Sequence, residues 1–159
     1  TYTAGVSYNK KEIIDNKIKI IKSNRGGKIT LHNPGQKIIY FVIDLNNIKK
    51  DIRKFINSIE ESIIQFLKSY KIQSKKDKKN IGIWVKDKKI AAIGIRVSRW
   101  VAYHGCSINI SNNLNQYLKI IPCGLNNKKV TSVLKIISVK PEKFENDLAK
   151  IFIKNINNI

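Results

Sequence analysis

The chain has 159 residues, of which 42% are hydrophobic and 26% are charged. Disordered chains combine high charge with few apolar residues, so this composition argues against disorder and predicts a folded core. The length is typical of one domain, and we therefore expect residues 1–159 to form a single α/β (α+β) domain.

The charge is strongly unbalanced, because 31 Lys and Arg oppose 11 Asp and Glu and give a formal net charge of +20. A field of this sign attracts acidic partners such as nucleic acid, an anionic membrane or an acidic protein. Only four of the cations are arginines, the residue better suited to planar phosphate recognition. A compositional drift towards Lys, Ile and Asn accounts for most of the excess and weakens the case for a nucleic-acid binder.

The two cysteines, Cys106 and Cys123, have neither the framework of a disulfide-rich protein nor the spacing of metal ligands. This predicts a reduced, cytoplasmic protein without a metal. No apolar run has the length of a membrane span, and the first residues, TYTAGVSYNKK, lack the hydrophobic stretch of a signal peptide. The sequence contains no Met, even at position 1, and opens on a strand-like TYT, so we expect an N-terminal segment to be missing.

In chain order, QKIIYFVIDL at 36–45 follows a Pro-Gly turn and predicts a buried strand. From position 48 to 70, apolar residues recur every three or four positions, which predicts an amphipathic helix. The polar, charged residues 74–80 predict a solvated loop, with a basic docking patch as the alternative.

Two apolar runs, at 81–85 and 89–97, flank a short polar turn and predict a hairpin. Residues 100–110 predict another strand, interrupted by Gly105, where backbone or ligand can approach closely. Near the end, Pro141 can occupy the first turn of a helix. Its apolar face would consist of Phe144, Leu148, Ile151 and Phe152.

The segment RGGKITLHNPGQ, residues 25–36, gathers Gly, Pro, an arginine and a histidine between two strand-like runs. Glycines permit unusual backbone angles and close approach, so a loop that cradles a substrate is one interpretation. The alternative is a tight hairpin with solvated side chains, because the segment matches neither the P-loop nor the dinucleotide fingerprint.

Cys123 lies between Pro122 and Gly124, on a rigid turn that can expose the sulfur next to a backbone N–H. That setting suits thioester chemistry, although a cysteine is more often a small buried hydrophobe. For Cys106, in an apolar strand, we expect burial, with at most a role in lining a pocket.

Lys89 is one of 27 lysines, and its position sets it apart because it begins the apolar strand IAAIGI, where its ammonium would be partly desolvated. Most lysines are simply solvated. His32 and His104 each lie beside a loop residue, so a Cys–His pair is a competing catalytic arrangement.

Together, TYTAG, RGGKITLHNPGQ, GIWV, KIAAIGIRVSRWVAYHG, SINI followed by NNL, PCGL and TSV resemble the lipoyl (octanoyl) transferase family. The blocks stand in the family's order and cover most of the chain up to Val133. In two places the sequence departs from the family. Asn33 replaces a loop glycine in HNPGQ, and Asn tolerates left-handed backbone better than most residues; Leu31 replaces an aromatic residue.

The resemblance implies a mixed sheet flanked by helices, similar to the catalytic domain of biotin protein ligase and lipoate ligase. It implies transfer of an octanoyl group from acyl carrier protein to a lysine of lipoyl domains, the first step of protein lipoylation, with no cofactor. The acceptors would be lipoyl domains of 2-oxoacid dehydrogenase complexes and the glycine cleavage H protein. We expect a monomer that binds neither nucleic acid nor membrane, and the positive charge would steer acidic carrier proteins to it.

By the same resemblance, Cys123 is the nucleophile, Lys89 is its catalytic partner, and His104 is a possible auxiliary residue. The implied substrate contacts are Arg25, Gly26, Gly27, Lys28, Ile29, Thr30, Leu31, His32, Ala92, Ile93, Gly94, Gly105, Cys106 and Ser107.

Three alternatives stay open on the sequence. One is an ATP-dependent lipoate or biotin ligase, which would need an adenylating site. The others are a degenerate, inactive remnant and, as the least favoured, a nucleic-acid binder, for which no aromatic RNA-binding signature is present.

Overall fold

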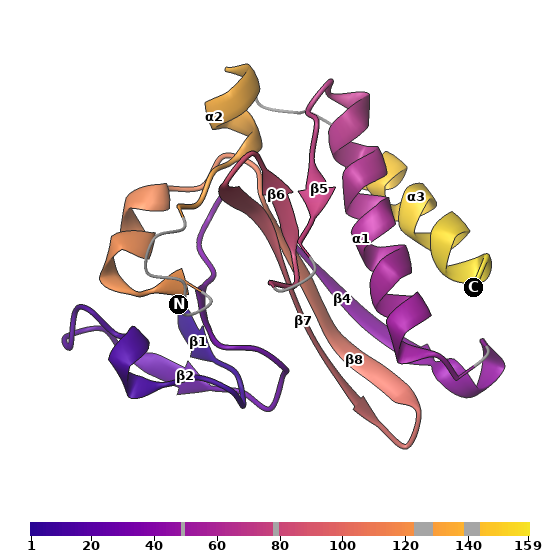
Figure 1. Ribbon diagram of the computed structural model, residues 1–159, viewed down its shortest axis with the longest axis horizontal. Helices are drawn as coiled ribbons and strands as arrows, with labels where there is room; N and C mark the ends of the chain where they lie inside the picture. The colour runs from indigo at the N-terminus through magenta and orange to yellow at the C-terminus, as the bar shows by residue number, and fades with distance from the viewer. Residues whose placement is uncertain (49, 78–79, 123–128, 139–143) are drawn as a thin grey trace.

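The structure is a computed structural model that describes residues 1–48, 50–77, 80–122, 129–138 and 144–159. Three layers follow one another: a small sheet, a larger sheet and a pair of helices (Figure 1). The small sheet contains β1 (Tyr2–Ala4), β2 (Ile20–Lys22) and β3 (Ile29–Leu31) in the order β2-β1-β3. β1 runs parallel to β2 and antiparallel to β3.

The larger sheet has the order β4-β8-β7-β6-β5, and all its neighbouring strands are antiparallel. Its strands are β4 (Gln36–Asp44), β5 (Lys75–Lys76), β6 (Ile83–Val85), β7 (Lys88–Ser98) and β8 (Val101–Asn109). The predicted hairpin is confirmed as β6 and β7. Residues 74–80 are not simply a loop, because Lys75 and Lys76 pair with β6 at the edge of the sheet.

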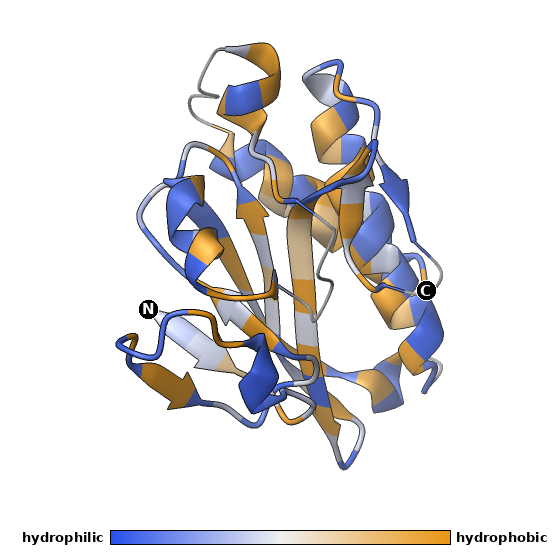
Figure 2. Ribbon diagram, turned by 60° about the vertical axis from the view of Figure 1, so that its left-hand side comes forward, coloured by the Kyte–Doolittle hydropathy of each residue, from blue (hydrophilic) through white to orange (hydrophobic). Residues whose placement is uncertain are grey.

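Helices α1 (Ile52–Ser69) and α3 (Glu145–Asn157) cover one face of the larger sheet (Figure 1). The Asp51 side chain caps α1 by accepting from the Lys54 N–H at 3.0 Å, so the helix begins four residues later than predicted. The helices alternate hydrophobic and hydrophilic residues along their length, as Figure 2 shows. Their apolar faces meet the sheet in a core where Phe41 contacts Phe55 and Phe152.

The predicted apolar face of the C-terminal helix is confirmed, since Leu148 and Phe152 are buried in this core. The helix begins at Glu145, and Pro141 lies outside the described residues. Shorter elements, which the sequence pattern did not reveal, are the 3-10 turns η1 (Lys10–Glu12), η2 (Leu45–Asn47) and η3 (Leu114–Lys119), and helix α2 (Val133–Ile137).

Strand β4 is correctly located by the sequence, but the prediction that it is buried is wrong. Among the strands that the structure describes it pairs only with β8, so it forms an edge of the sheet, and Tyr40 and Val42 are 78% and 80% exposed. A continuous apolar run is the pattern of a strand covered on both faces, and here the face opposite the helices stays largely open.

Strand β8 is also where predicted, but it is not interrupted at Gly105. Pairing with β4 and β7 continues through this residue. The unusual backbone angle belongs to its neighbour His104, whose φ is 69°. Gly105 is required for another reason: a Cβ there would lie 1.8 Å from the carbonyl oxygen of Ile39 on β4.

Candidate functional site

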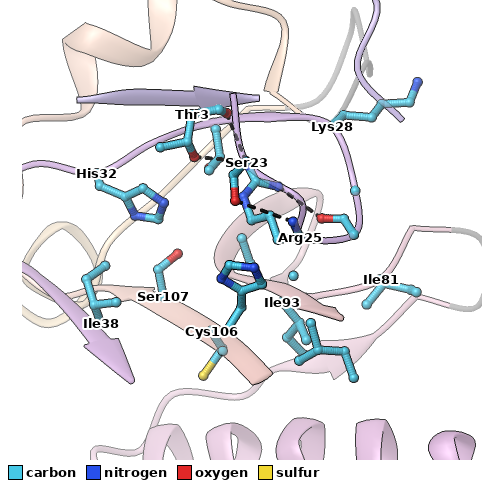
Figure 3. Close-up of a pocket in the computed structure, with 18 of the residues that line it drawn as sticks. Thr3, Ser23, Arg25, Lys28, His32, Ile38, Ile81, Ile93, Cys106 and Ser107 are labelled. Atoms are coloured by element: carbon cyan, nitrogen blue, oxygen red, sulfur yellow. Dashed lines mark hydrogen bonds between the residues drawn. The ribbon is translucent and has the colours of Figure 1, made fainter. Parts of the chain in front are cut away.

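A cavity of about 590 Å³ lies between the small sheet and the open face of the larger sheet. Its size is within the range of roughly 300–1,000 Å³ that is usual for small-molecule sites. Strands β4, β7 and β8 supply one wall, and Thr3, β3 and the segment around Arg25 supply the other (Figure 3). The walls contain apolar side chains, among them Ile38, Ile39 and Ile93, and a few polar groups.

All the predicted substrate contacts except Leu31 line this cavity. Leu31 is fully buried elsewhere, in a second apolar cluster with Ile29, Tyr117 and Ile120. Along β3 the side chains alternate between the two faces, so Thr30 lies at the cavity while Leu31 packs against η3.

The Arg25–Gly27 loop docks directly on β7. The Gly26 N–H donates to the carbonyl oxygen of Ile95 at 3.0 Å, and a Cβ on Gly26 would lie 2.8 Å from that same oxygen. A Cβ on Gly94 would lie 3.2 Å from the carbonyl oxygen of Gly26. The glycines in both segments therefore allow the loop and the strand to approach closely and close one side of the cavity.

Arg25 fastens this loop to the small sheet. Its Nη2 donates to the carbonyl oxygen and to Oγ1 of Thr3 at 2.8 and 2.9 Å, and its Nη1 donates to the Gly26 carbonyl oxygen at 3.0 Å. These contacts use the planar fork of the guanidinium on protein acceptors. The geometry thus gives Arg25 a structural function in shaping the cavity wall.

Lys89 lies buried in the cavity wall, at 7% exposure, near the start of β7. Its Nζ donates to the carbonyl oxygen of Ile81 at 2.8 Å and lies 5.4 Å from the centre of the Trp84 ring. The expected desolvation of the ammonium is therefore present, and a carbonyl oxygen and an aromatic face compensate for the lost water.

The proposed nucleophile, Cys123, lies outside the described residues. The described residues on both sides of it in sequence lie close to Lys89. Pro122 and Lys89 line one small hollow next to the cavity, together with Thr30 and Ser107. After the gap, Lys89 forms a parallel bridge with Val130.

Cys106 is among the residues that line the cavity, but its sulfur points away from it. Figure 3 shows its sulfur pointing towards α1, and the side chain is 5% exposed within the main core. Burial raises the pKa of its thiol far above the usual range. The expectation that Cys106 is a buried residue is confirmed, and its thiol is unsuited to be a nucleophile.

Both histidines line the cavity. The ring of His32 points into it, and its Nδ1 is buried with no hydrogen-bond partner among the described residues (Figure 3). Burial and the nearby Arg25 charge lower the pKa of His32. The Nε2 of His104 lies 2.6 Å from Oδ1 of Asn24, and burial and the charges of Arg25 and Arg96 lower the pKa of His104.

A polar network that sequence reasoning missed ties the HNPGQ turn to β8 and η3. Gln36 Nε2 donates to Asn109 Oδ1 and to the Tyr117 hydroxyl, both at 2.8 Å. The Asn33 amide donates to the carbonyl oxygen of Asn113 at 2.9 Å. Asn33 does not adopt a positive φ, so its side chain and not its backbone freedom explains its place there. Only its position next to Pro and Gly could have suggested a turn.

Within the described parts of the chain, no group of three or more His, Cys, Asp or Glu is arranged to hold a metal ion. Likewise, no helix that the structure describes has the length and hydropathy of a membrane span.

Comparison with known proteins decides the family. The family described as "Lipoyl protein ligase A/B catalytic domain" matches residues 1–153. The chain belongs to this family. An octanoyltransferase of Rickettsia rickettsii is 44% identical over 153 residues, covering 91% of this chain and 73% of the relative. An octanoyltransferase of Bartonella tribocorum is 43% identical over 149 residues, covering 85% of this chain and 61% of the relative.

These identities place the chain with the octanoyltransferases of the lipoyl protein ligase A/B family, as the sequence blocks indicated. The chain spans about 61% of the length of the Bartonella relative and 73% of the Rickettsia relative.

Solved structures confirm the expected fold at low sequence identity. Lipoate-protein ligase A bound with ATP has a TM-score of 0.71 at 13% identity, covering 99% of this chain and 68% of that one. The lipoate protein ligase of Thermoplasma acidophilum, described with its E2 lipoyl domain, has a TM-score of 0.67 at 14% identity and covers 99% and 66%. Biotin protein ligase from Aquifex aeolicus has a TM-score of 0.57 at 14% identity and covers 78% and 52%. This fold-level likeness shows the architecture that the family resemblance implied.

Proposed function

We propose that the protein transfers an octanoyl group from acyl carrier protein to a lysine of a lipoyl domain, through a thioester on Cys123. The observation that carries this proposal is the placement of the Lys89 ammonium. It is buried in the wall of a cavity with an apolar lining, and it shares a hollow with Pro122, which precedes Cys123 in sequence. Relatives named octanoyltransferase support the choice of acyl group.

The cavity offers the acyl chain an apolar binding surface. Ile38 and Ile93 line it, and Ala92 and Gly94 on β7 leave room because their side chains are small or absent. Burying each CH₂ group of the acyl chain contributes about 0.8 kcal/mol, so an eight-carbon chain gains substantial affinity from such a wall. Lys89, one of the polar groups at this wall, would lie near the reacting carbonyl.

In the first step, the Cys123 thiolate attacks the carbonyl carbon of the octanoyl thioester. A carbon–sulfur bond to Cys123 forms, the bond to the carrier's sulfur breaks, and the carrier thiolate leaves with a proton taken from the Lys89 ammonium. The exchange of one thioester for another costs little free energy. A nearby ammonium favours the anionic form of the cysteine, and this is the role we assign to Lys89.

In the second step, the amine of the acceptor lysine attacks the acyl-enzyme. A carbon–nitrogen bond forms, the bond to the Cys123 sulfur breaks, and the amine loses a proton. Lys89, neutral after it has protonated the carrier thiolate, accepts this proton, which restores the ammonium beside the Cys123 thiolate. The product amide is more stable than the thioester, so the step runs downhill without an added energy source.

Intact-mass spectrometry of the protein after incubation with octanoyl-acyl carrier protein tests the proposal. We expect one octanoyl adduct that hydroxylamine removes, that is absent in Cys123→Ala and that persists in the matched control Cys106→Ala. Addition of a lipoyl domain should then move the mass increment to the acceptor, whether or not ATP is present. Folded protein without an adduct, or an adduct that survives in Cys123→Ala, would contradict the mechanism.

A further inference from the structure

Glu12, the last residue of η1, carries a buried carboxylate that the proposed reaction does not use. The residue is 4% exposed, so its contacts must offset the cost of removing the carboxylate from water. Its Oε2 accepts from the Ile29 N–H at 3.4 Å, and its Oε1 lies 3.2 Å from Nζ of Lys28, an ion pair without the geometry of a hydrogen bond. Lys28 follows the Arg25–Gly27 loop, Ile29 begins β3, and both line the cavity. The side chain of Glu12 therefore holds one wall of the cavity.

The main chain of Glu12 contacts a different segment, residues 119–121. Its carbonyl oxygen accepts from the Ile121 N–H at 2.7 Å, and the next residue, Ile13, forms an antiparallel bridge with Ile120. Ile120 is buried in the second apolar cluster, which also contains residues of β3. The side chain and the main chain of one residue thus connect β3 to residues 119–121.

The segment that Glu12 holds through its main chain leads to the groups that we propose as catalytic. Pro122 comes directly after it and lines the small hollow next to the cavity together with Lys89. Cys123 follows Pro122 in sequence. Glu12 is therefore in contact both with the wall at which we place the acyl chain and with the segment that precedes the proposed nucleophile.

We propose that Glu12 is a positioning residue, which fixes residues 119–121 relative to the cavity wall formed by Lys28 and Ile29. A shift of the Glu12 side chain would move its main chain and, with it, the segment that ends at Pro122. The catalytic effect rests on the function proposed above, in which Cys123 must meet an acyl chain bound at this wall. Small displacements of reacting groups lower the rate strongly, so the connection through Glu12 sets the rate of transfer.

The two contacts of the carboxylate differ in weight. The side chain of Lys28 is 42% exposed, so water screens its attraction to Glu12. Ile29 is fully buried, and its N–H would lose its acceptor if the carboxylate moved away. The length of the Glu12 side chain should therefore matter more than its charge.

Two substitutions separate length from charge. Glu12→Asp keeps the charge but shortens the side chain, so the carboxylate no longer reaches the Ile29 N–H. Glu12→Gln keeps the length and an acceptor oxygen but removes the charge. Hydrogen–deuterium exchange with mass spectrometry follows the peptides that cover residues 26–31 and 117–122. Relative to α1, we expect exchange at least about tenfold faster in both peptides of Glu12→Asp, and within about twofold of the parent in Glu12→Gln.

Leu148→Ala is the matched control for a general loss of stability. Leu148 lies in the main core, whereas Ile29 and Ile120 lie in the second apolar cluster. The cavity that this substitution creates should raise exchange in α1 as much as in the two peptides. The proposal is overturned if exchange of residues 117–122 is unchanged in Glu12→Asp, or if Glu12→Gln has the same effect as Glu12→Asp.

Octanoyl transfer by the same variants distinguishes a failure of this proposal from a failure of the proposed function. If exchange changes as expected but the parent protein transfers no octanoyl group, the connection through Glu12 stands and the function fails. If the parent transfers, we expect kcat to fall at least about tenfold in Glu12→Asp, with little change in KM for the lipoyl domain, and to recover to within about threefold in Glu12→Gln. An unchanged kcat in Glu12→Asp, or an equal fall in Leu148→Ala, would overturn the positioning role.

Discussion

The Arg25 guanidinium donates two hydrogen bonds to Thr3, one to its carbonyl oxygen at 2.8 Å and one to its hydroxyl oxygen at 2.9 Å. Thr3 belongs to β1, and Arg25 begins the loop that docks on β7 through Gly26. This single side chain therefore links the small sheet to the larger one across the cavity wall. The arginine of the RGG block shapes the site by holding the loop in place.

We predict that Arg25→Lys lowers the free energy of unfolding by about 1–3 kcal/mol, because an ammonium cannot replace the forked contacts to Thr3 and Gly26. Urea denaturation measures this change, and KM for the octanoyl donor should rise as the wall loosens. Thr3→Ser is the matched control, since it keeps both acceptor atoms and should cost less than 1 kcal/mol. Equal stability of Arg25→Lys and the parent protein would refute the structural role.

Two glycines at the cavity should differ sharply in their tolerance of a methyl group. A Cβ on Gly105 would lie 1.8 Å from the Ile39 carbonyl oxygen, which belongs to the backbone of a paired strand. A Cβ on Gly94 would lie 3.2 Å from Cδ of Arg25 and from the Gly26 carbonyl oxygen, where a small adjustment suffices. We expect Gly105→Ala to cost about 3 kcal/mol or more and Gly94→Ala about 1 kcal/mol in urea denaturation. A larger loss of stability in Gly94→Ala than in Gly105→Ala would contradict this prediction, because it would show that β4 moves aside more easily than the docked loop.

The two cysteines should react very differently with iodoacetamide. Burial raises the pKa of Cys106 and removes it from solvent, so we expect no labelling of Cys106 in folded protein at pH 8. By the proposed function, Cys123 is labelled under the same conditions. Mass spectrometry should therefore find one label on folded protein and two in urea. Fast native labelling of Cys106 would contradict its burial in the core.

We expect the protonation of His32 to contribute to the pH dependence of the free energy of unfolding. Its pKa is lowered from 6.5, mainly by burial, so the folded state resists protonation more than the unfolded state does. Its contribution to stability is complete above pH 6.5 and is lost as the pH falls through the lowered pKa. We expect Tm to fall between pH 7 and pH 5, and the fall to be smaller in His32→Gln.

Glu60 contributes with the opposite sign in the acid range. Its pKa is raised from 4.5 by burial, so its contribution is complete below 4.5 and is lost as the pH rises through the raised value. Glu60→Gln should therefore raise Tm at pH 7, as thermal unfolding can show. A lower Tm at pH 7 would mean that favourable interactions of the carboxylate, such as that with Lys76, outweigh the cost of burial.

The sequence alone determined the family, most of the larger sheet and the two packed helices. Periodic apolar residues predict α1 and α3 because a helix must turn one face to the core. Alternating and β-branched runs predict β6, β7 and β8, and the ordered motif blocks identify the octanoyltransferase resemblance. Lys89 also stands out by sequence, because it begins an apolar strand.

Only the tertiary structure decided what the cavity residues contact. Three findings depend on partners that are distant in sequence. They are the edge position of β4, the packing of Leu31 in a second apolar cluster, and the hydrogen bonds from Arg25 to Thr3. The burial of Glu60 on the apolar side of α1 is likewise decided by packing and not by the helical pattern. The local sequence pattern shows which side chains prefer burial. Which polar groups form hydrogen bonds with each other is decided by the packing of segments that are distant in sequence.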